Sequence, residues 1–372
     1  ICALSNSNPV NNSYIIVGVE DENNEIVGDD FFDDSKIQNL VNAYIENPPK
    51  IQYENVPFPN LPKEAVDDVI LGCHNQAGED NRNVARMASL LSELPIKIGG
   101  ETVNRLCASG MAAISNAYRA IAIGEGDFYI AGGVEQMTRA PYVLSKSAQP
   151  FGRDVQLFDS SFGWRFVNPK MKELYGVDGM GETAENLAEI YKISREAQDE
   201  FALHSQQKAT SAQNSGRLAQ EIVNVEIPQK KGEPKIFSRD EFVKPDTTLD
   251  KLAKLRPAFK KDGGSVTAGN SSGLNDGAAA MILASEDAVK KYNLKPLAKI
   301  ISSAVVGVEP RIMGIGPVAA IPKAVQQAGL SLSQVDLVEL NEAFASQALA
   351  VTRELNLNPE IINVNGGAIA LG

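Results

Sequence analysis

The stretch ETVNRLCASGMAAISNAYRAIAIGEGDFYIAGG, residues 101–133, determines the fold class of this sequence. It opens with strand-forming residues at 101–106 and closes with a second apolar strand segment at 127–133. Between them, apolar side chains recur at helical spacing among alanines: Met111, Ile114, Tyr118 and Ile121. This spacing predicts a buried helix. Strand, helix and strand joined by short turns predict two parallel strands with a crossover helix, and hence an α/β fold.

The residues before this stretch fall into two parts. Residues 66–71, VDDVIL, predict a short buried strand that belongs to the same alternation. Residues 1–63 are instead rich in Asn, Asp and Glu, contain one candidate strand at 14–19, and end in a proline-rich stretch without helix or strand signals. We therefore expect an atypical N-terminal segment, 1–63, ahead of a domain that begins at residue 64.

Two features follow the strand–helix–strand stretch. Residues 141 to about 260 lose the alternation and contain a long amphipathic helix with Ser194 as the expected N-cap, so we expect an inserted loop region outside the sheet. Beyond it VDLVEL at 335–340 echoes VDDVIL and predicts another buried strand, and a Val-Asn pair later echoes the pair at 103–104. These echoes indicate an approximate internal duplication whose second copy ends before its last strand.

Composition and charge exclude several classes of protein. With 372 residues, 43% apolar and 22% charged, the chain has the profile of a globular protein with two domains or one large one. The net charge of −12 disfavours binding to nucleic acid or an anionic membrane, and no apolar run reaches the roughly 18 residues that span a bilayer. Three cysteines cannot form a disulfide framework, so we expect reduced thiols and a cytoplasmic location.

Cys107 is the sharpest catalytic candidate. It lies at the predicted strand-to-helix turn, where the positive end of a helix dipole favours the thiolate and so predicts a nucleophile near neutral pH. The small residues after it let a substrate carbonyl approach, and its own backbone N–H can help to hold an oxyanion. The alternative interpretation is a buried structural cysteine.

Three other features have both a chemical and a structural interpretation. Asn341 follows the predicted strand at 335–340 and opens a helix, so its amide holds a water or polarises a carbonyl, or it is a helix N-cap. The glycine-rich loop at 265–277 passes close to a ligand, or it is a plain turn. A cluster of cations in this acidic chain binds phosphates, with an affinity that falls as salt rises, or it is a solvated face. These cations are Lys251, Lys254, Arg256, Lys260 and Lys261.

The two histidines receive no catalytic role. His74 stands beside Cys73, but the sequence shows no further ligands at metal-binding spacing, so we expect no metal site. His204 falls within the long helix among Gln and Ser, and we expect it at the surface.

Together these motifs resemble those of the thiolase family, the acetyl-CoA C-acyltransferases, over roughly residues 62–372. Five segments occur in the order of that family: NRLCASG at 104–110, GGVEQM at 132–137, GNSSGLNDG at 269–277, NEAF at 341–344 and NGGAIALG at 365–372. Residues 76–83 and 158–166 look most like the 3-oxoadipyl-CoA and 3-ketoacyl-CoA branch of the family.

The resemblance implies thiolytic cleavage of a 3-oxoacyl-CoA to acetyl-CoA and a shortened acyl-CoA, or the reverse Claisen condensation, through an acyl-cysteine. Cys107 matches the nucleophile, and Asn341 matches the residue that holds a water in the oxyanion site for the thioester enolate. Coenzyme A is then a substrate, and no cofactor or metal is implied. Five residues match positions that line the pantetheine channel: Met180, Phe259, Ala268, Ser272 and Phe344.

The resemblance also implies the duplicated five-layered thiolase fold, an α/β fold of two βαβαβαββ-type halves with an inserted loop region that covers CoA. The N-terminal domain is expected at 64–287, with the loop region at about 141–260, and an incomplete C-terminal domain at 294–372. The implied assembly is a homodimer or homotetramer that acts on CoA thioesters and binds neither nucleic acid nor membrane.

The sequence departs from the family at both ends. The base histidine would follow the motif that ends here at Gly372, and a second cysteine, the proton donor to the enolate, would follow later. The early Arg-Thr-Pro segment has no counterpart in 1–63. Because the chain also begins at Ile1 without a leader, we expect a fragment clipped at both ends and, as written, without turnover.

Alternative functions stay open at this point. One is a biosynthetic acetoacetyl-CoA thiolase, and another is a non-catalytic thiolase-like protein that binds CoA or lipid. A ketoacyl synthase is disfavoured, because its two-histidine pattern is missing and the residues around Cys107 are thiolase-like.

Overall fold

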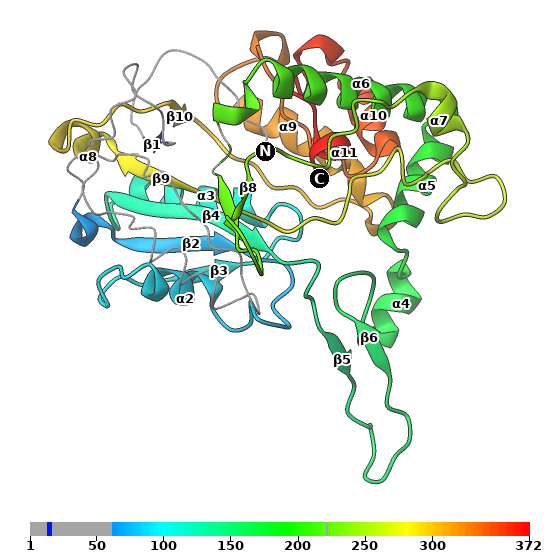
Figure 1. Cartoon of the computed structure of the whole chain (residues 1–372), viewed down its shortest axis with the longest axis horizontal. Coiled ribbons are helices and arrows are strands. Elements are labelled where there is room, and N and C mark those ends of the chain that lie inside the picture. Colours follow the sequence, from blue (N-terminus) through cyan, green and yellow to red (C-terminus); the bar gives the residue numbers. More distant parts are fainter. Residues whose placement is uncertain (1–12, 17–61, 221, 223) are drawn as a thin grey trace.

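A mixed six-stranded sheet forms the core of the first half of the chain. The computed structural model describes residues 13–16 and 62–372, apart from 221 and 223 (Figure 1). The strand order is β10–β1–β9–β4–β2–β3. β3 and β4 are parallel, as predicted, but they do not pair with each other, because β2 lies between them and pairs in parallel with both. β9, β1 and β10 pair antiparallel. The strands are β1 Ser13–Ile16, β2 Asp68–Gly72, β3 Glu101–Val103, β4 Phe128–Glu135, β9 Gly277–Ser285 and β10 Ala298–Ile300.

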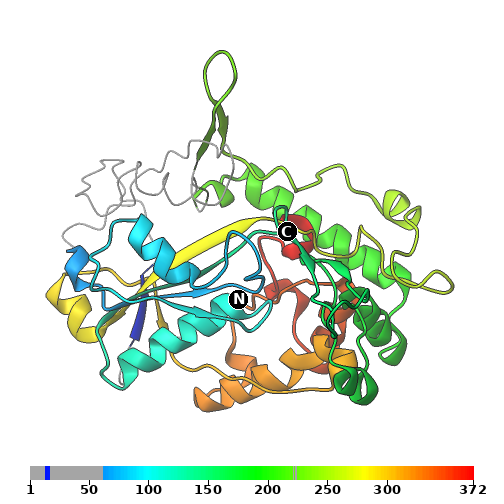
Figure 2. The same cartoon turned by 90° about the horizontal axis from the view of Figure 1, so that it is seen from below.

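Helices cover both faces of this sheet (Figure 2). The predicted helix is α3, Ser109–Ala122, and its buried alanines pack against Ile70 and Leu283 on one face. α2, Val84–Leu91, and α8, Glu286–Lys291, pack on the other face against Val69 and Ile282. Consecutive strand residues point to opposite faces. Because both faces are covered, the strands consist of nearly continuous apolar runs.

The predicted strand at 14–19 is present as β1, whose last residue is Ile16. Residues 17–19 lie outside the described part of the chain, as does nearly all of the N-terminal segment 1–63. Within the described residues, no helix is long and apolar enough to cross a bilayer.

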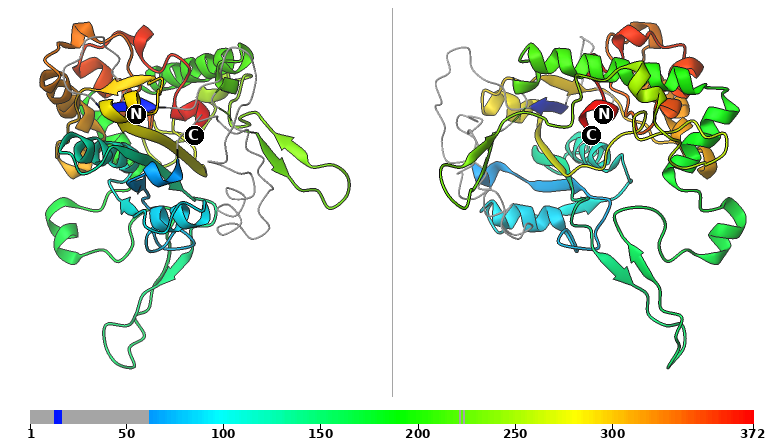
Figure 3. Two further views of the ribbon diagram at one scale, coloured as in Figure 1. Left: turned by 90° about the vertical axis from the view of Figure 1, so that its left-hand side faces the viewer. Right: turned by 45° about the vertical axis from the view of Figure 1, so that its right-hand side comes forward.

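The region at 141–260 leaves the sheet, as predicted. Its described strands form two separate hairpins, and the β5–β6 hairpin projects from the body of the molecule (Figures 1 and 3). Ser194 is the N-cap of the long helix, because its side chain accepts a hydrogen bond from the Ala197 N–H at 3.2 Å. The elements are β5 Tyr142–Leu144, β6 Leu157–Asp159, α4 Pro169–Tyr175, α5 Met180–Ile190, α6 Arg195–Asn214, η2 Leu218–Gln220, β7 Val225–Ile227, β8 Lys235–Phe237 and α7 Leu249–Ala253.

The last part of the chain is mainly helical. Its helices pack with α5 around the core residues Leu187, Leu340 and Val351 (Figure 1). Short 3₁₀ turns precede or follow the α-helices, and another, η1 Lys63–Ala65, precedes β2. The elements here are η3 Pro310–Ile315, α9 Gly316–Gln327, η4 Leu332–Gln334, α10 Ala345–Glu354, η5 Pro359–Ile361 and α11 Ala368–Leu371.

The predicted strand at 335–340 is wrong. The segment forms one isolated bridge, Val338 to Ile362, and not a ladder. A side chain takes the place of the next ladder bonds, since Asn363 Oδ1 accepts from the Leu340 N–H at 2.7 Å and Asn363 Nδ2 donates to the Leu340 carbonyl at 2.8 Å. The Val338–Ile362 bridge is parallel, like the pairing of β2 with β3. The two similar segments, 66–71 and 335–340, therefore both have a parallel neighbour.

A methyl group at Gly72 is expected to destabilise the fold. A Cβ atom there would lie 2.2 Å from the Ser109 carbonyl carbon and 2.4 Å from the Gly110 nitrogen, both in the α3 backbone. We expect Gly72→Ala to lower the free energy of unfolding in urea by about 1–3 kcal/mol. The control is Gly277→Ala, a strand glycine with nothing within 4 Å of its would-be Cβ. Equal losses in the two variants would contradict this close packing.

Candidate active site

A short turn between β3 and α3 presents Cys107. Leu106, the residue before it, has a φ of +50°, in the left-handed region that non-glycine residues adopt only when their surroundings hold them there. Asn104 Oδ1 accepts from the Leu106 N–H at 2.9 Å, and Ser109 Oγ donates to the Leu106 carbonyl at 2.6 Å. Two side chains therefore stabilise the strained turn that carries the thiol.

The Cys107 residue is exposed, so the alternative of a buried structural cysteine is wrong. The predicted activation by the helix end is not seen either. Desolvation by surrounding protein atoms raises the pKa of the Cys107 thiol, and the Glu135 charge raises it further, against a lowering by a hydrogen bond from its own backbone. The prediction of a thiolate near neutral pH therefore stays a prediction.

A cavity of about 300 Å³ joins Cys107 to the last part of the chain. Asn341 lies in its wall, so the fold brings together the two residues that the sequence predicted as catalytic. The N-cap interpretation of Asn341 is wrong, because α10 begins at Ala345 and its N-cap is Phe344. The remaining lining residues are Glu339, Leu340, Asn363, Gly366, Gly367, Ala368, Leu371 and Gly372.

Glu342 holds this cavity wall in place, a role that the sequence did not reveal. Its side chain is 2% exposed and accepts three hydrogen bonds: from Ser205 Oγ in α6 at 2.6 Å, Asn363 Nδ2 at 2.8 Å and the Ile369 N–H at 3.2 Å. Burial raises the pKa of the Glu342 carboxyl, and these donors act in the opposite direction. A Cβ at position 367 would lie 2.2 Å from the Glu342 carboxyl carbon, so a larger residue there would displace this buried carboxyl group.

Four of the five predicted pantetheine-channel residues lie together. Met180 and Phe344 belong to one apolar cluster, and the Phe259 ring packs edge-on against Phe344 at a centroid distance of 6.0 Å. Ser272 donates to the Ala343 carbonyl through its N–H at 3.1 Å and its hydroxyl at 3.2 Å. Ala268 is exposed in the same loop as Ser272. Phe344 lies three residues after Asn341, which lines the cavity, so this segment connects the apolar group with the cavity wall.

Ion pairs engage part of the predicted phosphate-binding cluster. Lys251 pairs with Asp246, and Lys260 pairs with Glu189 at 3.3 Å. All four side chains are largely exposed, and such pairs contribute little and exchange readily with other anions. Phosphate binding by this cluster stays a prediction.

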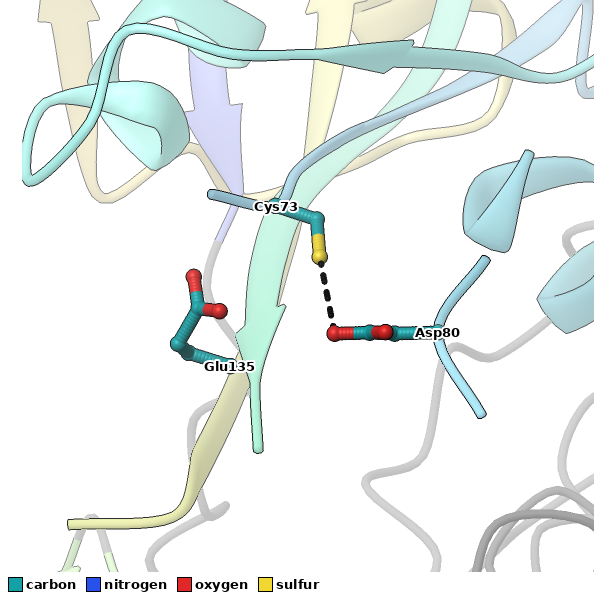
Figure 4. Close-up of side chains that lie close together, drawn as sticks. All are labelled: Cys73, Asp80 and Glu135. Atoms are coloured by element: carbon teal, nitrogen blue, oxygen red, sulfur yellow. Dashed lines mark hydrogen bonds between the residues drawn. The ribbon is translucent and has the colours of Figure 1, made fainter. Parts of the chain in front are cut away.

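Figure 4 shows a second group of side chains, Cys73, Asp80 and Glu135, whose potential ligand atoms lie within 4.8 Å of one another. Cys73 is a free, buried thiol that donates to Asp80 Oδ2 at 3.6 Å. Burial raises its pKa to about 12, with further contributions from the Glu135 and Asp80 charges. Hydrogen bonds thus account for the group without an ion, and the expectation of no metal site stays a prediction. His74 contributes only its backbone here, and His204 is exposed on α6.

Three family models match parts of this chain. The family model described as "Thiolase, N-terminal domain" matches residues 54–287, and "Thiolase, C-terminal domain" matches 294–372. A third model, "Schlafen, AlbA_2", matches residues 1–99 and overlaps the first.

Among curated relatives, the 3-oxoadipyl-CoA/3-oxo-5,6-dehydrosuberyl-CoA thiolase of Escherichia coli is 56% identical over 84% of this chain and 79% of its own. The beta-ketoadipyl-CoA thiolase of Acinetobacter baylyi is 57% identical over the same shares. Among solved structures, human mitochondrial 3-ketoacyl-CoA thiolase in complex with CoA has a TM-score of 0.78 at 39% identity, covering 97% of this chain and 87% of the other. The Bacillus anthracis acetyl-CoA acetyltransferase has a TM-score of 0.78 at 38% identity, covering 98% and 89%.

Alkylation of Cys107 is expected to rise steeply with pH. Because its pKa is raised above the ordinary 9.0, the thiolate fraction should be small at pH 7 and should keep growing beyond pH 9. The measurement is the rate of iodoacetamide modification, with the modified peptide mapped by mass spectrometry. Buried Cys73 serves as the internal control and stays unmodified in the folded protein. A plateau reached below pH 8 would contradict the raised pKa.

Glu342 is expected to make stability depend on pH. Its folded pKa is raised above 4.5, so the folded state binds the proton more tightly than the unfolded state. Its stabilising contribution should therefore be greatest in acid and be lost as the pH rises from about 4.5 through the folded pKa. The free energy of unfolding of wild type minus Glu342→Gln, from urea unfolding at several pH values, should fall accordingly. A difference that is constant with pH, or that Glu354→Gln at an exposed position on α10 reproduces, would refute this.

Proposed function

Since this chain belongs to the thiolase family, we propose that it cleaves 3-oxoadipyl-CoA with CoA, giving acetyl-CoA and a shortened acyl-CoA, through an acyl-cysteine at Cys107. The observation that carries the proposal is the cavity that Cys107 and Asn341 share, although they lie in different halves of the chain. The relatives named for 3-oxoadipyl-CoA and beta-ketoadipyl-CoA support the substrate.

The reaction follows from the residues in the cavity. The Cys107 sulfur attacks the C3 carbonyl of the 3-oxoacyl-CoA and passes its proton to a base, a role that the family resemblance gives to a histidine. The C2–C3 bond breaks, and the electron pair leaves as the acetyl-CoA enolate, which takes up a proton. The thiol of a second CoA then attacks the acyl-cysteine and releases the shortened acyl-CoA. In our proposal Asn341 holds a water that stabilises the enolate oxygen.

The apolar group next to the cavity fits the pantetheine arm of CoA. Met180 and Phe259 offer a partly exposed apolar surface that packs against the buried Phe344, and Ala268 and Ser272 lie on the adjoining loop. The likeness to a human thiolase solved in complex with CoA supports this assignment. CoA acts as a substrate here, and the proposal requires no cofactor.

For the architecture we propose the duplicated five-layered arrangement, with domains at 64–287 and 294–372, the insertion at 141–260 and a separate segment at 1–63. The parallel Val338–Ile362 bridge, which repeats the sense of the β2–β3 pair, supports the duplication. The free thiols of Cys73 and Cys107 support a reducing compartment such as the cytoplasm.

For the assembly we propose a homodimer or homotetramer. The projecting β5–β6 hairpin carries large exposed apolar side chains, including Tyr142, Leu144 and Phe151, which a second copy of the chain could cover. Sedimentation velocity decides this, and a monomer at micromolar concentration would refute it.

The decisive experiment compares substrates and locates the acyl group. In a protein that also carries the family's base histidine and second cysteine, we expect thiolysis of 3-oxoadipyl-CoA with a kcat/KM at least about tenfold above that for acetoacetyl-CoA, together with an acyl adduct on the Cys107 peptide. Cys107→Ser should lower turnover by roughly a thousandfold. The matched control is Cys2→Ser, because Cys2 lies outside the residues that the thiolase N-terminal model matches. A preference for acetoacetyl-CoA would favour the biosynthetic alternative, and CoA binding without an adduct or turnover would favour the non-catalytic one.

A further inference from the structure

A carboxylate at the end of β4 binds the loop that follows β2. Glu135 is the last residue of β4, and its two oxygens accept hydrogen bonds from consecutive backbone amides, His74 N–H at 2.8 Å and Asn75 N–H at 2.9 Å. Figure 4 shows Glu135 beside Cys73, where this loop begins. Because β2 and β4 are parallel neighbours, their carboxyl ends meet at one edge of the sheet. Glu135 thus fixes the loop relative to the sheet.

The same loop holds the turn that carries Cys107. Asn104 Nδ2 donates to the His74 carbonyl at 3.0 Å, and Asn104 Oδ1 accepts from the Leu106 N–H at 2.9 Å. Leu106 is the residue in the strained left-handed conformation, directly before Cys107. A continuous series of hydrogen bonds therefore runs from Glu135 through His74 and Asn104 to Leu106, and we name it the Glu135 strap.

We propose that Glu135 is a positioning residue for the nucleophile: through the Glu135 strap it holds the strained turn in the conformation that presents the Cys107 sulfur to the cavity. A misplacement of about 1 Å at a reacting atom can slow a reaction by about a hundredfold, so a device that fixes this turn acts directly on the rate. The inference rests on the proposed acyl transfer at Cys107.

The charge of Glu135 gives the proposal an independent signature. Desolvation is the main cause of the raised pKa of Cys107, and the Glu135 charge adds to it. Cys73 and Asp80 face Glu135 from the loop after β2, Glu339 faces the Cys107 cavity, and Arg105 is adjacent to the turn in the chain. Among the described residues, Glu135 is the charged group that raises the pKa of Cys107, so its removal should lower that pKa.

Replacement of Glu135 by Gln should therefore move two measurements in opposite directions. An amide has one oxygen, so Glu135→Gln loses one of the two backbone hydrogen bonds together with the charge. We expect acylation of Cys107 at saturating acetyl-CoA to slow by roughly tenfold, with little change in the half-saturating concentration. Iodoacetamide modification of Cys107 at pH 8 should instead become roughly two- to tenfold faster, because its pKa falls. Urea unfolding of the variant shows whether it is folded.

Two further variants separate positioning from simple support of the fold. Asp67 makes the matching contact at the opposite end of β4, where Oδ2 accepts from the Asp127 N–H at 2.7 Å and the Phe128 N–H at 2.9 Å. Asp67→Asn removes the charge of this carboxylate while its one remaining oxygen can still accept both bonds, so it controls for the loss of a carboxylate and should change neither measurement. Asn104→Ala breaks the Glu135 strap without removing the charge, so it should slow acylation without lowering the pKa of Cys107. If Glu135 acts through Asn104, the double variant should be no slower than the slower single variant.

The proposal is overturned if Glu135→Gln resembles Asp67→Asn in both measurements, or if the penalties of Glu135→Gln and Asn104→Ala simply add. A wild-type protein that no acyl-CoA acylates would refute the proposed function. Hydrogen exchange at the Leu106 amide would still decide the Glu135 strap, since exchange that Glu135→Gln does not accelerate contradicts it.

Discussion

A buried carboxyl group at Glu342 is the interaction on which the candidate site depends. An acidic side chain that is 2% exposed is tolerated only where donors surround it, and here the donors come from three separate segments of the chain. Ser205 belongs to α6, Asn363 follows η5, and Ile369 lies in α11. Satisfying this one group therefore brings the inserted region, the NEAF segment and the glycine-rich end of the chain together, and these last two form most of the cavity wall.

A second carboxylate has a corresponding task on the other side of the cavity. Glu135 binds the backbone of the loop after β2, and that loop holds the turn of Cys107. Both carboxylates accept hydrogen bonds from uncharged donors of separate chain segments. Close backbone packing completes the arrangement, since Gly72 lets the start of α3 lie directly on β2.

The environment of Cys107 shows that position and reactivity are separate properties. The turn presents the sulfur to the cavity, yet desolvation and the nearby carboxylate raise its pKa. A neutral thiol resists oxidation and random alkylation, because the thiolate is the reactive form. It becomes a nucleophile only when a base removes its proton during the attack on substrate, which couples activation to the presence of substrate in the site.

Local patterns in the sequence predicted the parts of the fold that local forces determine. The spacing of apolar residues predicted β2, β3, β4 and α3, and Ser194 was predicted correctly as the N-cap of α6. These predictions succeeded because strand alternation, helical spacing and capping depend on residues only a few positions apart. The motifs also named Cys107 and Asn341, although their shared cavity became visible only in the fold. The strand predicted at 335–340 failed because a strand exists only with its neighbours, and the Asn363 side chain replaces that partner.

Tertiary structure alone decided the roles of Glu135 and Glu342 and the raised pKa of Cys107. Glu135 binds amides 60 and 61 positions earlier in the chain, and Ser205 precedes Glu342 by 137 positions. No local pattern marks such pairs, because a carboxylate accepts a hydrogen bond from any donor that folding brings within reach. Desolvation is likewise set by every chain segment around a group at once, so the pKa of Cys107 followed from how the chain packs rather than from its place at a helix end.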